Sequence, residues 1–362
     1  MNKPIVSVVM VVCNRDRFLA EAIESILAQT FRDFEFIIVD YGSTDRSKSI
    51  ISSLAARDQR IKLHQIPNCS LPEARNAACF LAQGKYIAII DADNVSLPER
   101  LNWEVQFMEE HPEVGVVGGG MKAIDATGAS LPDSALPYGA APRPVENSAI
   151  QSALLSNCVI WQNSVLMRKE AFTLVGGYRA LFLQAEDYDL WLRIAERFEM
   201  ANLKHVVFKL RYHPHQLSVR KRTQQTLCYL AARASAHCRK TGQADPLDSA
   251  KEITPAVLVA LGVSYPAQQL ALSNTYRAQI HCMSALGEWS GALNLAMEML
   301  RSSDWEYVGR PVIANMRLEA ALVYWKNNRF LKSIFTAGHA VMTRPLLVGR
   351  PVKRLLVRLE WL

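Results

Sequence analysis

The stretch YIAIIDADNVSLPERL, residues 86–101, joins an apolar run to two acids, Asp91 and Asp93. An apolar run of this length predicts a strand that is buried on both faces. Side chains at i and i+2 of an extended chain point the same way, so both carboxylates can converge on one point. Such hard oxygen ligands suit Mg²⁺ or Mn²⁺, whose other ligands come from water and phosphate. A D-x-D pattern also arises by chance in turns and caps, but its position behind a buried strand favours a metal site.

The first half of the chain alternates two kinds of pattern. Strand-like apolar runs occur at 6–12, 34–39, 60–65, 86–90 and 114–117, and segments with helical spacing separate them. This alternation predicts an α/β fold with a mostly parallel sheet flanked by helices. Open sheets of this kind bind ligands at the carboxyl ends of their strands, where Asp91 and Asp93 lie.

The second half has a different character. A stretch rich in Pro and Ala at 135–144 predicts a loop or a crossing between halves. Beyond about residue 222 the strand patterns largely vanish, and amphipathic segments predict an all-helical C-terminal region. Two of these segments loosely resemble paired-helix repeats, although they show no fixed period. We therefore expect one domain at 1–220 and a helical region at 221–362.

The composition is that of a globular protein. The chain has 362 residues, 50% of them hydrophobic, enough for one large or two moderate domains. Its 41 Lys and Arg exceed its 34 Asp and Glu, which fits a polyanion, a membrane surface or simply a basic protein. No recognised nucleic-acid motif occurs, so we expect no specific nucleic-acid partner.

Cysteine usage and hydropathy indicate the compartment. The seven cysteines are odd in number and form no CxxC pair, so neither a disulfide framework nor a zinc site is indicated. A reducing cytoplasm fits best. The apolar run near the N-terminus stops at Asn14, so we interpret it as a first strand rather than a signal peptide. No stretch approaches the roughly 20 apolar residues of a membrane-spanning helix, and we expect that the chain does not cross a bilayer.

The tetrapeptide SLPE occurs at Ser70–Glu73 and again at Ser96–Glu99. In each copy the serine can cap a helical amide, the glutamate can reach back to the serine amide, and proline fits the first turn. Both copies therefore predict a helix start with a capping box.

Further acids follow strand ends or open helices. Asp40 ends the run FEFIIVD, where its carboxylate would suit a base that presents an N–H, as uracil, thymine and guanine do. The alternative is a helix cap from Ser43, Thr44 or Asp45. Glu186, Asp187 and Asp189 open a later helix, either because acids favour a helix N-terminus or because one of them is a general base.

Five blocks of the sequence together resemble one family. They are VSVVMVVCNRDRFLAEAIESILAQTFRDFEFIIVDYGSTD, ARNAA, YIAIIDADNVSLPERL, AEDYDLWLRIA and HPHQLS. In order and spacing they are similar to the family 2 glycosyltransferases, which are inverting enzymes of the GT-A fold. The similarity covers roughly residues 3–220 and leaves the helical remainder outside.

The resemblance implies a function and a set of site residues. It implies transfer of a sugar from a nucleotide-diphosphate donor, a UDP-sugar, to a hydroxyl of a saccharide or lipid-linked acceptor. The reaction would belong to cell-surface polysaccharide or glycan synthesis, and Mn²⁺ or Mg²⁺ would be the cofactor. By the same resemblance, Asp40 contacts the base, and Arg75 and Asp91 contact the nucleotide. Asp91 and Asp93 contact the metal and the diphosphate. The resemblance also implies that Asp187 is the general base and Glu186 its companion. His213 resembles a histidine that in some relatives reaches the metal or pyrophosphate, and a plain loop histidine is the alternative.

Two positions depart from the family pattern. The family usually has DDGS where this chain has Asp40-Tyr41-Gly42-Ser43. It often has DADD where this chain has Asp91-Ala92-Asp93-Asn94. These departures keep open a weakened or noncatalytic sugar-nucleotide-binding relative. On the acceptor side, Trp161, Gln162 and the stretch 135–144 are candidates to border the site, and a core tryptophan is the alternative.

The end of the chain has an unusual composition. The stretch TRPLLVGRPVKRLLVRLEWL, residues 343–362, mixes five basic residues with leucine, valine and tryptophan. This composition suits an anionic lipid surface, so we expect a cytoplasmic protein that associates peripherally with the inner membrane face. A helix packed on the domain is the alternative.

Overall fold

The protein is described by a computed structural model that covers residues 3–132, 143–213, 221–301, 305 and 307–344. The chain divides into two compact units. One takes in the described parts of Met1–Ser130, Pro142–Tyr212 and Ala231–Ile253, and the other takes in those of Leu131–Ala141, His213–Leu230 and Thr254–Leu362. The domain boundary at residue 220 stays a prediction, as does the loop at 135–144, most of which lies outside the described residues.

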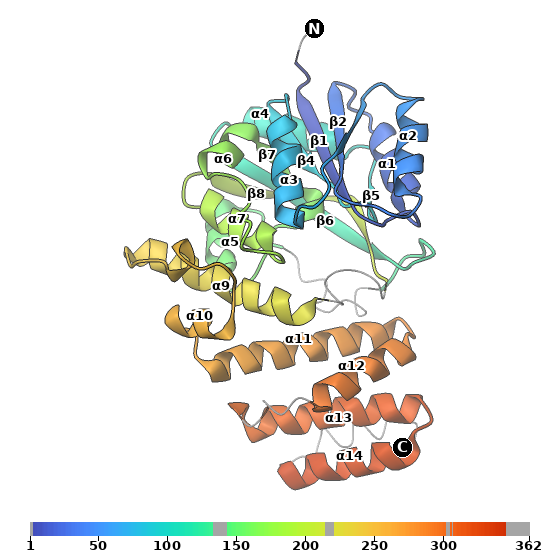
Figure 1. The fold of residues 1–362 in the computed structure, drawn as a ribbon, viewed down its shortest axis with the longest axis vertical. Coiled ribbons are helices and arrows are strands. Elements are labelled where there is room, and N and C mark those ends of the chain that lie inside the picture. Colours follow the sequence, from blue (N-terminus) through green and yellow to red (C-terminus); the bar gives the residue numbers. More distant parts are fainter. Residues whose placement is uncertain (1–2, 133–142, 214–220, 302–304, 306, 345–362) are drawn as a thin grey trace. The chain divides into compact units, whose positions relative to one another are not determined.

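The first unit is built on a single sheet (Figure 1). Its strands are β1 (Val6–Val12), β2 (Phe34–Asp40), β3 (Ile61–Gln65), β4 (Tyr86–Ile89), β5 (Val95–Ser96), β6 (Val114–Ile124), β7 (Leu166–Arg168) and β8 (Glu199–Arg211). They lie in the order β3-β2-β1-β4-β7-β6-β8-β5. Four neighbouring pairs are parallel, and β4–β7, β6–β7 and β5–β8 are antiparallel. The predicted α/β fold with a mostly parallel sheet is confirmed.

Helices cover both faces of this sheet. They are α1 (Leu19–Leu27), α2 (Ser47–Ala55), α3 (Leu71–Leu81), α4 (Arg100–Glu110), α5 (Asn147–Leu154), α6 (Lys169–Leu174) and α7 (Glu186–Ile194), with the short 3-10 helix η2 (Gln162–Ser164). Apolar side chains of α1, α2 and α4 join the even-numbered residues of β1 in one core, and α3 packs on β1 and β2. Every residue of β1 and β2 is buried, which explains their apolar runs without polar alternation.

The two SLPE segments have different structures. At α3 the Glu73 carboxylate accepts from the Ser70 amide at 2.7 Å, so the predicted capping box is confirmed. The prediction for Ser96 is wrong, because Ser96 lies in β5 opposite Phe208 and α4 begins only at Arg100. The Ser96 hydroxyl instead accepts from the Arg100 guanidinium at 3.1 Å. Antiparallel pairing of the backbone thus overrides a local helix-start pattern.

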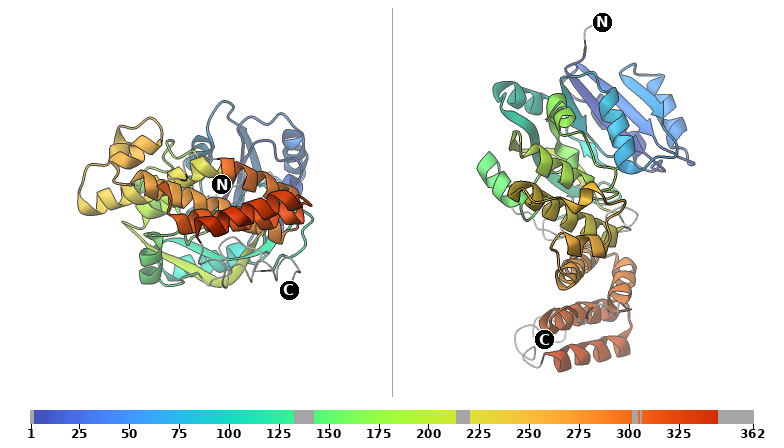
Figure 2. Two further views of the ribbon diagram at one scale, coloured as in Figure 1. Left: turned by 90° about the horizontal axis from the view of Figure 1, so that it is seen from below. Right: turned by 60° about the vertical axis from the view of Figure 1, so that its left-hand side comes forward.

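The second unit consists of helices in its described residues. The helix α9 (Arg222–Thr241) spans the division between the units, and the short η3 (Pro246–Asp248) after it still belongs to the first unit. The further helices of the second unit are α10 (Pro255–Ala260), α11 (Tyr265–Ala285), α12 (Trp289–Arg301), α13 (Arg310–Lys326) and α14 (Phe330–Thr343). Helices α11 to α14 each pack against the next one along the chain (Figure 2). The described residues after β8 form no strand, as predicted. Among the described residues, no helix is long and apolar enough to cross a membrane.

Candidate functional site

The candidate site lies at the carboxyl ends of parallel strands. β1, β2 and β4 run parallel, so their ends meet at one edge of the sheet, where open α/β folds bind ligands. Asp40 ends β2, and Asp91 comes two residues after β4. Two acids that lie 51 positions apart in the sequence therefore belong to the same edge.

Arg75 connects this edge to α7. Its side chain is only 7% exposed, and it donates to Asp91 Oδ1 at 2.8 Å and to the carboxylate of Glu186. Burial opposes the charge of Arg75, but Glu186 and Asp91 outweigh it and raise the pKa of the guanidinium. Burial also disfavours the charged form of Glu186 and raises the pKa of its carboxyl to about 7, although the positive charge of Arg75 lowers this pKa. One arginine thus links an acid behind β4 with an acid that opens α7.

Asn163, in η2, holds Asp91 from the other side. The Asn163 Oδ1 accepts from the Asp91 amide at 2.6 Å, and its Nδ2 donates to Asp91 Oδ2 at 2.7 Å. Both carboxylate oxygens of Asp91 are therefore held in fixed directions. The sequence analysis missed Asn163, and its place in a polar turn next to the strand that pairs with β4 is the one signal that could have pointed to it.

Asp93 and Asn94 are fixed by the end of β8. Asp93 is partly exposed, and its backbone carbonyl accepts from Arg211 Nε at 3.1 Å. Asn94 is buried and its Oδ1 accepts from the Arg211 amide at 2.9 Å. The departure at Asn94 therefore has a structural role, because its amide oxygen ties the loop behind β4 to β8.

Arg100 lies beneath this loop. It is completely buried and donates to the backbone carbonyls of Ile89 and Val165, both at 3.0 Å. Its Nε also donates to Glu104 at 3.0 Å. Because Ile89 ends β4, Arg100 fixes the point at which the acidic loop leaves the sheet.

Asp40 shapes its own turn. Its Oδ1 accepts from the amides of Gly42 at 3.1 Å and Ser43 at 2.8 Å, and no described residue donates to Oδ2. Gly42 has φ of 126°, a conformation that L residues with side chains rarely adopt. The charges of Arg75 and Asp91 are close enough to affect the ionisation of Tyr41, and burial raises the pKa of its hydroxyl to about 12. The departure at Tyr41 therefore borders the site.

The three acids of α7 have different surroundings. Glu186 is buried on Arg75, whereas Asp187 is partly exposed. Burial in the site raises the pKa of Asp187, and Arg75 lowers it. The residue before them, Ala185, has φ of 60°, a left-handed conformation that costs a residue with a Cβ about 1–3 kcal/mol. This turn directs the first residues of α7 toward Arg75.

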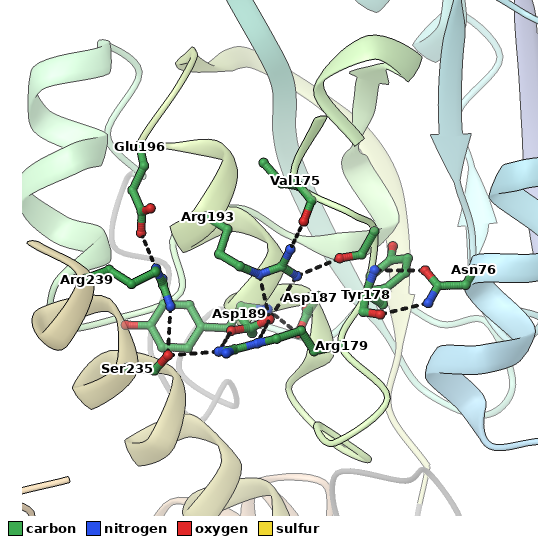
Figure 3. A network of polar contacts seen from close by, with 12 residues as sticks. Asn76, Val175, Tyr178, Arg179, Asp187, Asp189, Arg193, Glu196, Ser235 and Arg239 are labelled. Atoms are coloured by element: carbon green, nitrogen blue, oxygen red, sulfur yellow. Dashed lines mark hydrogen bonds and ion pairs between the residues drawn. The ribbon is translucent and has the colours of Figure 1, made fainter. Parts of the chain in front are cut away.

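Asp189 belongs to the interior instead (Figure 3). It is completely buried and accepts from Arg179 Nε at 3.1 Å and from Arg193 Nε at 3.0 Å. Arg193 also donates to the backbone carbonyls of Val175 and Gly177, both at 2.7 Å. Asp189 therefore holds α7 in the fold, and of this acid cluster only Glu186 and Asp187 stay candidates for a catalytic role.

Two of the acceptor-side candidates, Gln162 and Trp161, also have different surroundings. Gln162 is buried and donates to the Tyr178 hydroxyl at 2.8 Å, which is a structural contact. Trp161 is partly exposed, and the Arg143 guanidinium lies 3.8 Å from its ring centroid. Arg143 also donates to the carbonyl of Cys158, a residue within electrostatic reach of Asp187. Trp161 thus stays a candidate to border the acceptor site.

Asp91 and Asp93 are the candidate metal ligands of the site. Among the described residues, no three His, Cys, Asp or Glu side chains converge as metal ligands. Mg²⁺ and Mn²⁺ sites often have only one or two carboxylates and complete their shell with substrate phosphates, and Asp91 with Asp93 fits that pattern. His213 is buried two residues beyond the end of β8, and its role as a ligand stays a prediction.

Comparisons with known proteins identify the family. The sequence model of Glycosyl transferase family 2 matches residues 7–173. The putative glycosyltransferase EpsE of Bacillus subtilis is 36% identical over 213 residues, which is 58% of this chain and 73% of EpsE. The chain belongs to glycosyltransferase family 2. The O-antigen biosynthesis glycosyltransferase WbnJ of Escherichia coli is 30% identical over 212 residues, 58% of this chain and 80% of WbnJ. The predicted family is confirmed.

Solved structures share the fold of this family 2 glycosyltransferase. The mannosyltransferase PcManGT from Pyrobaculum calidifontis, in complex with GDP-Man and Mn²⁺, has a TM-score of 0.54 at 18% identity over 95% of this chain and 89% of that one. S. aureus TarS 1-349 in complex with UDP-GlcNAc has a TM-score of 0.51 at 16% identity over 91% of this chain and 88% of that one. The predicted GT-A fold is confirmed.

Proposed function

We propose that this glycosyltransferase moves a sugar from a UDP-sugar to a hydroxyl of a saccharide or lipid-linked acceptor, with inversion at the anomeric carbon. The observation that carries the proposal is the bridge from Arg75 to Asp91 and Glu186, which joins the donor side of the site to the start of α7. The name of the O-antigen biosynthesis glycosyltransferase WbnJ supports a role in cell-surface polysaccharide synthesis.

Asp40 is the proposed contact for the base. With Oδ1 engaged by two backbone amides, Oδ2 is the oxygen available to accept from a base N–H. Uracil and guanine present such an N–H, and the solved neighbours are complexes with UDP-GlcNAc and GDP-Man. Tyr41, at the border of the site, is a neighbour for the nucleotide.

Asp93 and Asp91 are the proposed holders of Mn²⁺ or Mg²⁺ together with the donor diphosphate. When bound, the ion stabilises the negative charge that grows on the leaving nucleoside diphosphate. The contribution of the chain is to hold in place the turn that carries the two carboxylates. Asn163 and Arg75 do this for Asp91, and Arg211 does it for the backbone of Asp93.

Asp187 is the proposed general base. The acceptor oxygen forms a bond to the anomeric carbon, the bond from that carbon to the diphosphate oxygen breaks, and the acceptor proton passes to Asp187. This proton transfer contributes about 10²–10⁴-fold to the rate. A base works in its deprotonated form, so the rate should rise with pH through the pKa of Asp187, which burial raises.

A panel of nucleotide sugars tests the proposal most directly. The purified chain is incubated with each donor and Mn²⁺, and released nucleotide is measured with and without chelator. We expect release from a UDP-sugar that depends on the metal and on Asp93. The rival function is a noncatalytic module, and nucleotide binding without release from any donor in the panel would favour it.

The cellular location is also proposed. The basic and apolar stretch at 343–362 supports association with the inner face of a membrane, where a lipid-linked acceptor would lie. Apart from residues 343 and 344, this stretch lies outside the described residues. Equal vesicle binding by the full chain and by a chain ending at residue 344 would contradict this role.

A further inference from the structure

The last described helix of the second unit has a large exposed apolar face. On α14, four apolar side chains are more than half exposed: Leu331 (76%), Ile334 (56%), Phe335 (71%) and Met342 (69%). Their spacing along a helix puts all four on one side. The opposite side packs on α13, where Ser333 and Ala340 are buried. In the view from below, α14 lies in front of the other helices of its unit (Figure 2, left).

The chain from α13 through α14 carries almost only positive charge. α14 itself contains no Asp or Glu, and the residues from 310 to 344 include six Lys and Arg. The single acid in that stretch, Glu319, pairs with Arg277 at 2.8 Å. Lys326, Arg329 and Lys332 are exposed at or near the start of α14. The apolar face is therefore bordered by positive charge.

We propose that this face of α14 docks on an anionic lipid surface. The four apolar side chains would enter the boundary between headgroups and acyl chains, and the three basic side chains would contact lipid phosphates. The arrangement argues against a second copy of the chain as the occupant. A two-fold contact would bring the same basic border against itself, and such like-charge contacts are unfavourable.

The proposal is independent of the sugar-transfer chemistry and of the stretch beyond residue 344. The residues that carry it are all described, and they differ from those that the proposed transfer uses. A surface of this kind would hold the enzyme at the lipid plane, where a membrane-bound acceptor substrate is confined.

The test measures binding of the full chain to sucrose-loaded vesicles. Vesicles of phosphatidylcholine alone are compared with vesicles that also contain phosphatidylglycerol. Replacing Leu331 and Phe335 together by Ser should weaken binding to the anionic vesicles by at least about tenfold, since two large apolar groups no longer leave water. Replacing Arg329 and Lys332 together by Gln should weaken it by about tenfold or more and reduce the preference for phosphatidylglycerol.

A matched control uses a Leu and a Phe elsewhere. Leu174 is 63% exposed and Phe80 is 54% exposed, both in the first unit. Replacing these two together by Ser should leave vesicle binding unchanged. Binding by the α14 variants at parent strength would overturn the proposal and assign any lipid binding to other parts of the chain.

Two further measurements complete the test. Sedimentation equilibrium without lipid detects self-association. The proposal would be overturned in favour of a second copy if the chain did not bind vesicles and formed a dimer that the Leu331 and Phe335 changes abolish. UDP release from the soluble donor should be the same in parent and α14 variants. Failure of sugar transfer with intact vesicle binding would remove the proposed function and leave this surface in place.

Discussion

Asn163 and Asp91 hold each other through two hydrogen bonds, one from the Asp91 backbone amide to Asn163 Oδ1 at 2.6 Å and one from the Asn163 Nδ2 to Asp91 Oδ2 at 2.7 Å. The pair joins η2 to the loop behind β4, and Arg75 occupies the remaining oxygen of Asp91. Asp91 is therefore directed by two partners from distant parts of the chain. Such outer partners of a metal-binding carboxylate are themselves expected to affect metal affinity.

Replacing Asn163 by Ala should weaken metal-dependent nucleotide binding. The change leaves the Asp91 amide without its acceptor and releases one carboxylate oxygen, and loss of an outer partner of this kind typically costs about 10–100-fold. Calorimetric titration of UDP with and without Mn²⁺ would measure the effect. Asn157→Ala, an exposed asparagine on the same stretch, is the control and should behave like the parent. Unchanged Mn²⁺-dependent affinity in Asn163→Ala would show that the pair is not a positioning contact.

Replacing Asp187 by Asn should lower sugar transfer by about two to four orders of magnitude. Asparagine keeps a polar side chain but cannot accept the proton of the acceptor hydroxyl. UDP affinity should barely change, because the proposed nucleotide contacts are made by Asp40, Arg75 and the metal site. Transfer rate and UDP affinity are measured on the same preparation. A variant that transfers at close to the parent rate would remove Asp187 as the base and make Glu186 the next candidate.

Replacing Asp189 by Asn should affect stability instead. The side chain is completely buried between Arg179 and Arg193, so the change leaves two guanidinium groups without their shared counter-ion. Breaking a buried ion pair in this way costs about 3–5 kcal/mol of the free energy of unfolding. Urea unfolding followed by circular dichroism provides the measurement. Asp187→Asn, two residues earlier on the same helix, is the matched control and should unfold like the parent.

The sequence predicted the strands that are buried on both faces but missed the longest one. β1 and β2 are apolar except for Ser7, Glu35 and Asp40, because helices cover both sides. β8 carries Lys204, His205 and Lys209, and its pairing with β6 shifts register three times, so no clean alternation marks it. Its existence depends on pairing with β6 and β5 rather than on a local pattern.

Some residues of the site have a local signal in the sequence, whereas others are brought together by contacts between distant positions. Asp40 and Asp91 could be predicted because Asp40 ends an apolar strand and Asp91 comes two residues after one. The contact between Asn163 and Asp91 spans 72 positions, and the one between Arg75 and Glu186 spans 111, so neither leaves a local signal. The two SLPE segments are identical in sequence, and only the pairing of Ser96 with Phe208 separates a strand from a capping box.

Glu104 should make the stability of the protein depend on pH. Burial raises the pKa of Glu104 to about 7 despite its ion pair with Arg100, so in the folded state it binds a proton at a pH where the unfolded chain has released it. The folded state then holds more protons between about pH 4.5 and pH 7, and this group's contribution to stability decreases as pH rises through that range. Glutamine cannot ionise, so the free energy of unfolding of Glu104→Gln relative to the parent should shift in favour of the variant from pH 5 to pH 8. Urea unfolding at several pH values measures this difference, with the exposed Glu24→Gln as control. A constant difference between variant and parent over that range would show that Glu104 stays ionised in the fold and that Arg100 neutralises it fully.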